Sequence, residues 1–300
     1  DTASVQGDFS FGEKQLISVG GDWQQDDITS TTAFDADSRD NTGVFVEYQG
    51  TFGTQQLQAS VRNDDNEQFG NHTTGSVGWG MAFGSGFKLN ASYGTGFKAP
   101  TFNDLYYPFF GNPDLEPESS KSLNVGLAQY ANAWSWTFNV YETRVDDLIS
   151  YDAAIFLPNN IETARIRGAE LTGAMSLAGW DIAAQISHTD PRNRTDGYNH
   201  GNVLARRARD TARIDVDRDF GEFRFGITAN GVGHRFDDAA NSVRLAGYGT
   251  LDLRVEYALH RDWTLQARAT NVFDRDYETI AWYNQPGREY GLSIRYQSAQ

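Results

Sequence analysis

The stretch 251–270, LDLRVEYALHRDWTLQARAT, decides the fold. Apolar residues alternate with polar or charged residues on both sides of a short connection at His260-Arg261. The apolar series is Leu251, Leu253, Val255 and Tyr257 in the first half and Trp263, Leu265, Ala267 and Ala269 in the second. Because a period of two places these side chains on one face of a strand, the stretch predicts an antiparallel hairpin with one apolar and one polar face.

The same alternation recurs along the 300 residues and predicts about fifteen strands. Most of them have 9–13 residues, which suits the ~9–11 residues that a tilted strand needs to cross a bilayer. The expected strands are residues 2–10, 14–26, 42–51, 54–64, 71–83, 86–95, 119–130, 132–144, 161–175, 178–189, 208–217, 221–233, 247–258, 261–273 and 287–297.

The connections between these strands alternate between short and long. The short ones centre on residues 11–13, 52–53, 84–86, 131, 177–179, 220–221 and 260–261. The long ones are residues 27–41, 65–70, 96–118, 145–160, 190–207, 234–246 and 274–286. Tight turns at one rim and long loops at the other are typical of an outer-membrane barrel, whereas a soluble β-sandwich has no reason to sort its loops this way.

Aromatic and charged residues favour the same architecture. Aromatic residues cluster beside the short turns and near the long loops, as expected for rings at headgroup level, although aromatics also favour strands in general. A basic side chain facing lipid at the midplane would cost about 2–4 kcal/mol, so charged strand positions are expected on the opposite face. These positions are Lys88, Arg213, Asp215, Asp252, Arg254, Glu256, Arg268 and Arg295. The sequence thus predicts an all-β protein, a transmembrane antiparallel β-barrel.

Composition narrows the function. The chain has no cysteine, which excludes disulfides and thiolate metal sites. Its net charge of −15 argues against nucleic acid, because phosphate binding needs a basic face. Bacterial single-chain barrels have even strand numbers, so fifteen strands indicate either a count that is off by one or a barrel only partly contained in the chain.

Several motifs resemble those of one family. Residues 92–100 (SYGTGFKAP) followed by 111–118 (GNPDLEPE) are similar to the YGxGFKAP…GNPxLxPE signature of TonB-dependent receptors. Residues 164–170 (ARIRGAE) resemble a later strand of that family, and residues 271–278 (NVFDRDYE) with 286–290 (PGREY) resemble its final hairpin. The resemblance covers nearly the whole chain and implies a receptor of the Gram-negative outer membrane, in contact with its lipid.

Within this family, residues 62–70, 145–152 and 204–208 resemble the cobalamin (vitamin B12) receptors. The resemblance implies that residues 1–300 are the C-terminal portion of a barrel of roughly 22 strands, without the plug domain. The expected function is binding of cobalamin or a related chelate at extracellular loops, for import energised by TonB through the plug. The alternatives are a ferric-siderophore receptor and a barrel fragment that serves as a surface or phage-binding protein.

No enzyme is expected. The five histidines are scattered, none has a metal-ligand spacing such as HExxH, and no GxSxG nucleophile elbow is present. Carboxylates at alternate loop positions can ligate calcium, so two acidic loops are weak calcium candidates, with plain solvated loops as the alternative. The residues concerned are Asp35, Asp37, Asp40, Asp64, Asp65 and Glu67.

Ligand-binding candidates lie on the long loops. The rings of Tyr106, Tyr107 and Phe109 can stack on a large planar ligand or pack on each other. Arg206 can donate to amide or phosphate oxygens, and its LxRRA context resembles a ligand-contact segment of the cobalamin receptors; a barrel-wall ion pair is the alternative. By the same resemblance, Trp282 and Tyr283 match an aromatic contact position.

Overall fold

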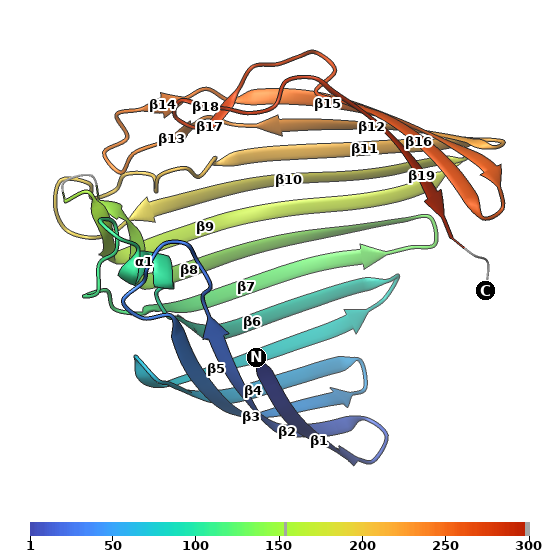
Figure 1. Cartoon of the computed structure of the whole chain (residues 1–300). Coiled ribbons are helices and arrows are strands. Elements are labelled where there is room, and N and C mark those ends of the chain that lie inside the picture. Colours follow the sequence, from blue (N-terminus) through green and yellow to red (C-terminus); the bar gives the residue numbers. More distant parts are fainter. Residues whose placement is uncertain (153–154, 298–300) are drawn as a thin grey trace. The chain divides into compact units, whose positions relative to one another are not determined.

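The computed structural model describes residues 1–152 and 155–297. In this part of the chain, fifteen long strands form one sheet in which each strand hydrogen-bonds to its neighbours in chain order (Figure 1). The strands are β1 (Thr2–Phe11), β2 (Gln15–Asp27), β3 (Ser38–Phe52), β4 (Gln55–Asn66), β5 (Gly70–Phe83), β6 (Phe87–Lys98), β7 (Glu118–Tyr130), β8 (Trp134–Asp152), β9 (Leu157–Leu177), β10 (Trp180–Asn193), β11 (Asp210–Phe220), β12 (Phe223–Val232), β15 (Tyr248–His260), β16 (Trp263–Thr270) and β19 (Glu289–Tyr296). The prediction of an antiparallel all-β fold is confirmed.

The expected strand ends lie within a few residues of the observed ends except at β8, which continues to Asp152 rather than ending at residue 144. Most of the expected loop 145–160 is therefore strand, and its residues 153–154 lie outside the described part. Asp147 has a left-handed φ of 58°, which interrupts the alternation that the sequence pattern needs. The strand continues because Glu118 accepts the Ile149 N–H at 3.0 Å and Asn160 donates to the Asp147 carbonyl at 2.6 Å.

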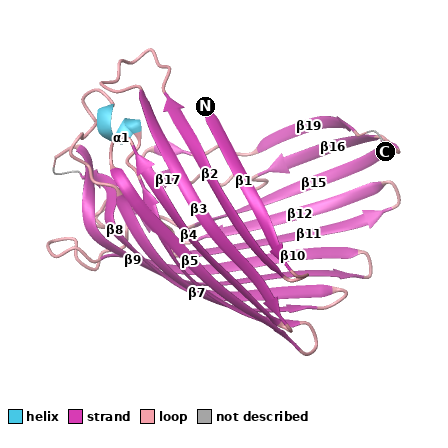
Figure 2. Cartoon of the chain, turned by 90° about the horizontal axis from the view of Figure 1, so that it is seen from below, coloured by secondary structure: helices cyan, strands magenta, loops and turns pink. Residues whose placement is uncertain are grey.

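Three long loops contain short elements that the sequence did not predict. The loop 96–118 holds a one-turn helix, α1 (Phe102–Tyr106), shown in cyan in Figure 2. The loop 234–246 holds the hairpin of β13 (Arg235–Phe236) and β14 (Arg244–Leu245). The loop 274–286 holds the hairpin of β17 (Glu278–Ile280) and β18 (Tyr283–Asn284). No helix among the described residues has the length and apolar character to cross a membrane.

Two-residue turns close two of the short connections. Phe52 pairs with Gln55 across Gly53, and Phe220 pairs with Phe223 across Gly221. Both glycines have a φ of 62°, the conformation that a type II′ turn requires at its first central residue. The twist of this turn matches that of the strands, so each Phe-Gly pair fixes the register of its hairpin.

The chain forms two compact units. Unit 1 comprises Asp1–Leu127, Val140–Arg167 and Arg192–Gly201. Unit 2 comprises Ala128–Asn139, Gly168–Pro191 and Asn202–Gln300.

In unit 1 the two faces of the sheet differ in chemistry. Val44, Val46 and Val61 are exposed on one face. On the other face, the Arg62 guanidinium of β4 reaches Asp22 of β2, with N–O distances of 2.6 and 2.8 Å, and also binds Asp64. The side chain passes over Gly43 of the intervening strand β3, where a Cβ would lie 1.9 Å from Arg62 Nη2. A glycine on the middle strand thus makes room for an ion pair between strands two apart.

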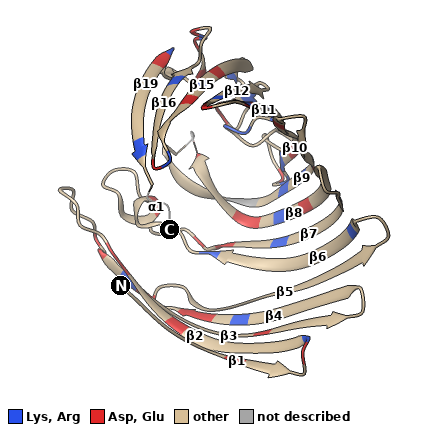
Figure 3. Cartoon of the chain, turned by 90° about the vertical axis from the view of Figure 1, so that its right-hand side faces the viewer, with Lys and Arg blue, Asp and Glu red and all other residues tan. Residues whose placement is uncertain are grey.

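Unit 2 repeats this arrangement. Arg254 of β15 reaches Asp217 of β11 across Gly226 of β12, where a Cβ would lie 2.7 Å from Arg254 Nη2. The register of β11, β12, β15, β16 and β19 places the predicted charged positions of unit 2 on one face, and Figure 3 marks charged residues along the strands. These positions are Arg213, Asp215, Asp252, Arg254, Glu256, Arg268 and Arg295.

Buried apolar side chains are concentrated at the long-loop ends of the strands. In unit 1 they include Phe102, Leu105, Leu115, Val145 and Leu148, and in unit 2 Val203, Leu204, Leu245 and Ala281. Along the strands, large apolar side chains are instead exposed on one face. Exposed apolar surface of this extent needs an apolar partner, and a bilayer supplies one for a strand-built wall.

We predict that Gly43→Ala destabilises the protein. The added methyl group displaces the Arg62 guanidinium from Asp22, at a cost of about 1.5–3 kcal/mol, the typical worth of a hydrogen bond to a charged group. The midpoint of urea unfolding of the receptor in detergent measures the effect. Gly78→Ala is the control, because the nearest atom to its Cβ, in Gln58, is 4.0 Å away. Equal midpoints for the two variants would contradict the prediction.

Candidate functional site

The long loop of unit 1 is built around α1. Thr101 caps the helix through a reciprocal pair: its hydroxyl accepts the Asp104 N–H at 3.2 Å and Asp104 accepts the Thr101 N–H at 3.0 Å. Two residues of the helix, Phe102 and Leu105, are buried. A Cβ at Gly111 would lie 2.5 Å from the Leu105 carbonyl oxygen, so a glycine is needed for the chain to return across the helix.

Residues of β3 and of the turn between β4 and β5 hold this loop in place. Arg39 of β3 donates to the Pro100 carbonyl at 2.9 Å, and its guanidinium lies 5.0 Å from the ring centre of Phe102. Gln68 donates to the Tyr106 hydroxyl at 2.5 Å. The polar end of Tyr106 is therefore engaged within the protein, which favours a structural contact for this residue over direct ligand contact.

The neighbouring rings remain accessible. The Tyr107 ring packs edge-on against Phe34 and Phe110, at centroid distances of 6.0 and 6.5 Å, and Phe110 stacks on Tyr151 at 5.9 Å. Phe109 makes no such contact among the described rings and is 104% exposed. Its φ of 62° turns it out of the packed row. Unit 1 thus presents a row of partly exposed rings with one fully exposed ring beside it.

In unit 2, the β13–β14 hairpin organises the loops. Asn241 at its turn accepts the Val203 N–H at 2.9 Å and donates to the Val203 carbonyl at 2.8 Å, so its side chain pairs with the backbone of the preceding loop as a strand would. Asn202 donates to the Ala239 carbonyl at 2.9 Å. Val203, Leu204 and Leu245 are buried at this junction.

Arg206 belongs to the preceding loop and contacts the β13–β14 hairpin. Its N–H donates to the Phe236 carbonyl at 2.6 Å, and its Nε donates to Asp237 Oδ1 at 2.9 Å. A left-handed φ of 60° allows both bonds from one residue. The side chain of Arg206 is still 51% exposed, and a guanidinium has five N–H donors, so donors remain for a ligand.

Trp282 and Tyr283 form the tip of the β17–β18 hairpin. Trp282 has a φ of 65°, and its N–H donates to Glu278 at 3.1 Å, which closes the turn. The two side chains are 84% and 67% exposed. The preceding residue, Ala281, is buried, and its N–H donates to Asp237 Oδ1 at 3.2 Å.

The structure therefore brings three of the predicted binding residues, Arg206, Trp282 and Tyr283, onto loops that meet at Asp237. The other three, Tyr106, Tyr107 and Phe109, lie together in unit 1. Asp237 and Asn241 were not predicted from the sequence. Their only signal was the turn-forming composition of residues 237–242, which does not reveal a long-range contact.

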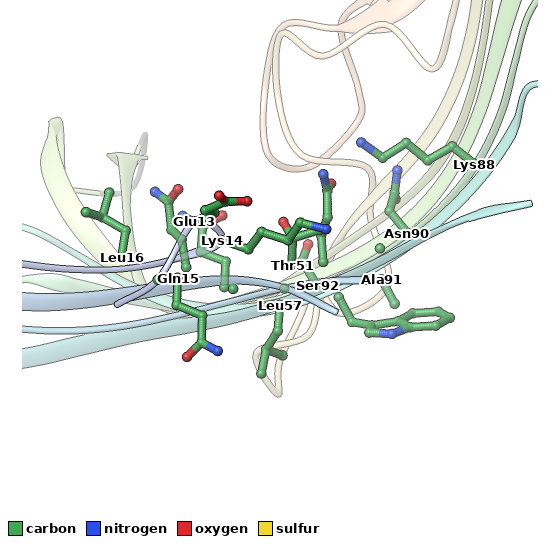
Figure 4. A pocket seen from close by; sticks show the side chains of 18 of the residues that line it. Glu13, Lys14, Gln15, Leu16, Thr51, Leu57, Lys88, Asn90, Ala91 and Ser92 are labelled. Carbon is green, nitrogen blue, oxygen red and sulfur yellow. The ribbon is translucent and has the colours of Figure 1, made fainter. Parts of the chain in front are cut away.

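The polar face of unit 1 has a recess of about 650 Å³ near the short turns (Figure 4). Lys88 and Asn90 point to one side of the sheet here and Leu57 to the other. Lys14, Gln56 and Gln58 also line the recess. Amide and ammonium groups make it a polar surface suited to a polar partner rather than to a small apolar ligand.

The acidic loops show no metal-binding cluster. Within residues 1–152 and 155–297, no group of three or more His, Cys, Asp or Glu side chains is placed to hold a metal ion. Asp64 is engaged by Arg62 and Asn41, and Glu67 accepts the Asp40 N–H. These carboxylates are used for strand and loop structure.

Comparisons agree with this architecture. Residues 1–272 match the family model "TonB dependent receptor-like, beta-barrel". The vitamin B12 transporter BtuB of Photobacterium profundum is 31% identical over 305 residues, which cover 98% of this chain and 49% of the transporter. The chain thus spans about half the length of this curated relative.

Solved structures show the same fold at lower identity. A variant of the ferric enterobactin receptor PfeA from Pseudomonas aeruginosa superposes with a TM-score of 0.79 and 16% identity, covering 98% of this chain and 53% of that one. The siderophore receptor PirA from Acinetobacter baumannii gives a TM-score of 0.78 and 16% identity, covering 98% and 54%.

We predict that order in the β13–β14 hairpin depends on the ionised form of Asp238. Burial raises the pKa of Asp238, but hydrogen bonds from the backbone N–H groups of Val243 and Ser242 and from the Ser242 hydroxyl outweigh it and hold the pKa below its ordinary value. A lowered folded-state pKa stabilises the hairpin above the ordinary Asp value of 3.8, and this stabilisation is lost as the pH falls further.

Pepsin, which is active in this range, measures the effect through cleavage within residues 235–245. Wild-type cleavage is expected to rise as the pH falls below 3.8, after normalisation to an unfolded substrate. Cleavage of Asp238→Asn within the hairpin should occur at every pH and should not rise as the pH falls below 3.8. A rise of the same size in the variant would contradict the assignment.

Proposed function

The chain belongs to the TonB-dependent receptor family of outer-membrane proteins, whose members are receptors and transporters rather than enzymes, and we propose that it binds cobalamin for import across the outer membrane. The observation that carries this proposal is 31% identity to a vitamin B12 transporter over 98% of the chain. The siderophore receptors, at 16% identity, support the fold alone.

The long loops suit a ligand of this kind. Cobalamin combines a large ring system with peripheral amides and a phosphate. Exposed rings of Trp282 and Tyr283 in unit 2, and of Tyr107 and Phe109 in unit 1, offer flat apolar surfaces. The donors of Arg206 that Asp237 does not use are available to amide or phosphate oxygens. We therefore retain these five residues as ligand contacts and assign Tyr106 to loop support.

The polar face of the sheet suits the interior of a transporter. Arginines on this face pair with carboxylates, as in Arg62–Asp22 and Arg213–Asp215, so these charges compensate one another within the wall. In the complete receptor, this face surrounds a plug domain, and TonB acts on the plug to open the path. The recess beside Lys88 and Asn90 is a polar surface for such a partner.

We predict that the complete receptor binds cyanocobalamin and that Trp282→Ala weakens binding by about tenfold or more, because exposed tryptophans that become buried contribute strongly to binding. Equilibrium binding to receptor in detergent measures the affinity. Phe52→Ala is the control. This exposed ring is the last residue of β3 and lies beside a short turn, at the end of the strand away from the long loops. Ferric enterobactin serves as the competing ligand class.

Binding of ferric enterobactin without binding of cyanocobalamin at micromolar concentration would overturn the ligand assignment. Equal affinities of wild type and Trp282→Ala for cyanocobalamin would overturn the assignment of this loop as a contact.

A further inference from the structure

Asp237 joins two loops that carry residues proposed to contact the ligand. Its Oδ1 accepts from Arg206 Nε at 2.9 Å and from the Ala281 N–H at 3.2 Å, and its Oδ2 accepts from Arg206 Nη2 at 3.4 Å. We propose that Asp237 is a positioning residue that couples the Arg206 loop to the Trp282–Tyr283 loop. The coupling rests on the geometry, and its importance for binding rests on the proposed function.

The carboxylate is well placed for this role because it is sheltered. The side chain of Asp237 is 13% exposed, whereas that of Arg206 is 51% exposed. A charge-assisted hydrogen bond that is shielded from water is stronger than one on an open surface. The carboxylate thus stays in place while the outer part of the guanidinium remains open to a ligand.

The bond to Ala281 determines where Trp282 lies. Ala281 is 4% exposed, so water cannot replace Asp237 as the acceptor for its N–H without a movement of the loop. A buried N–H that loses its acceptor costs free energy, so the segment shifts toward solvent when Asp237 is removed. Trp282 follows directly, in a strained left-handed conformation that the turn maintains.

The hairpin that carries Asp237 is itself rigid. The Asp237 N–H donates to the Val243 carbonyl at 2.9 Å, and Arg235 pairs with Leu245. Asn241 fixes the hairpin to Val203, three residues before Arg206. Asp237 therefore lies on a firm base between the two loops, and a displacement on one side is transmitted to the other.

The coupling has a consequence for ligand binding. A ligand that holds Arg206 in its observed position also holds the Asp237 carboxylate, which in turn favours the observed position of Ala281 and Trp282. Because coupling between two sites is reciprocal, a contact at Trp282 strengthens a contact at Arg206 to the same degree.

Hydrogen exchange of the complete receptor without ligand tests the coupling directly. We expect Asp237→Ala to accelerate exchange in residues 278–285 by about tenfold. Arg206→Ala should accelerate it in the same residues by a smaller factor, although the hydrogen bonds of Arg206 described above all go to the β13–β14 hairpin. Asp237→Asn, which keeps the size and one acceptor oxygen, should give an intermediate value if Asp237→Ala does not fold.

Asp276→Asn is the matched control. This carboxylate lies in the same loop and is exposed, and it makes no side-chain hydrogen bond or ion pair with another residue in the described part of the chain. Exchange in residues 278–285 should equal that of wild type.

Unchanged exchange in Arg206→Ala would overturn the coupling, even if the receptor binds cyanocobalamin. Accelerated exchange in a receptor that binds no cyanocobalamin would keep the coupling and reject the proposed ligand. If the coupling and cyanocobalamin binding are both observed, the combined variant Arg206→Ala/Trp282→Ala should lose less affinity for cyanocobalamin than the product of the fold-losses of the two single variants. Strictly multiplicative losses would reject a role for the coupling in binding.

Discussion

The constraint on which the rest of the structure depends is the hydrogen bonding of backbone groups in an apolar medium. A wall that faces lipid has to pair its N–H and C=O groups internally, and strands do so only with neighbouring strands. One face of each strand is then largely apolar, and most of the charge lies on the other face. The ion pairs across Gly43 and Gly226 show how that second face accommodates arginines without leaving them unpaired.

The loops follow a different rule because lipid does not cover them. They bury apolar side chains in small cores of their own, around Leu105 in unit 1 and Leu204 in unit 2. These cores fix the backbone from which exposed rings and Arg206 project. Ordered binding residues on a wall of strands therefore require local packing at each loop, supplied by α1 in one unit and the β13–β14 hairpin in the other.

The strands were predictable because a period of two acts locally, whereas the contacts of the loops were not. Arg206 and Trp282 were predicted as ligand contacts by resemblance, but nothing in the sequence places Asp237 between them. The continuation of β8 was missed because the left-handed Asp147 breaks the alternation and long-range bonds to Glu118 and Asn160 compensate for the break. Local pattern determines the wall, and side-chain contacts distant in sequence determine the site.

The same difference between wall and loops explains why the fold can be inferred from distant relatives whereas the ligand cannot. Receptors with 16% identity share the wall, since many apolar residues satisfy an exposed strand face. Under the proposed function a binding loop tolerates less, because Arg206 would satisfy Asp237 and a ligand at once. The five donors of a planar guanidinium permit this, whereas a lysine ammonium carries its three donors on one atom and cannot form the same two-bond contact with a carboxylate. Exchange of Arg206 for lysine therefore keeps the charge but removes the two-bond contact with Asp237.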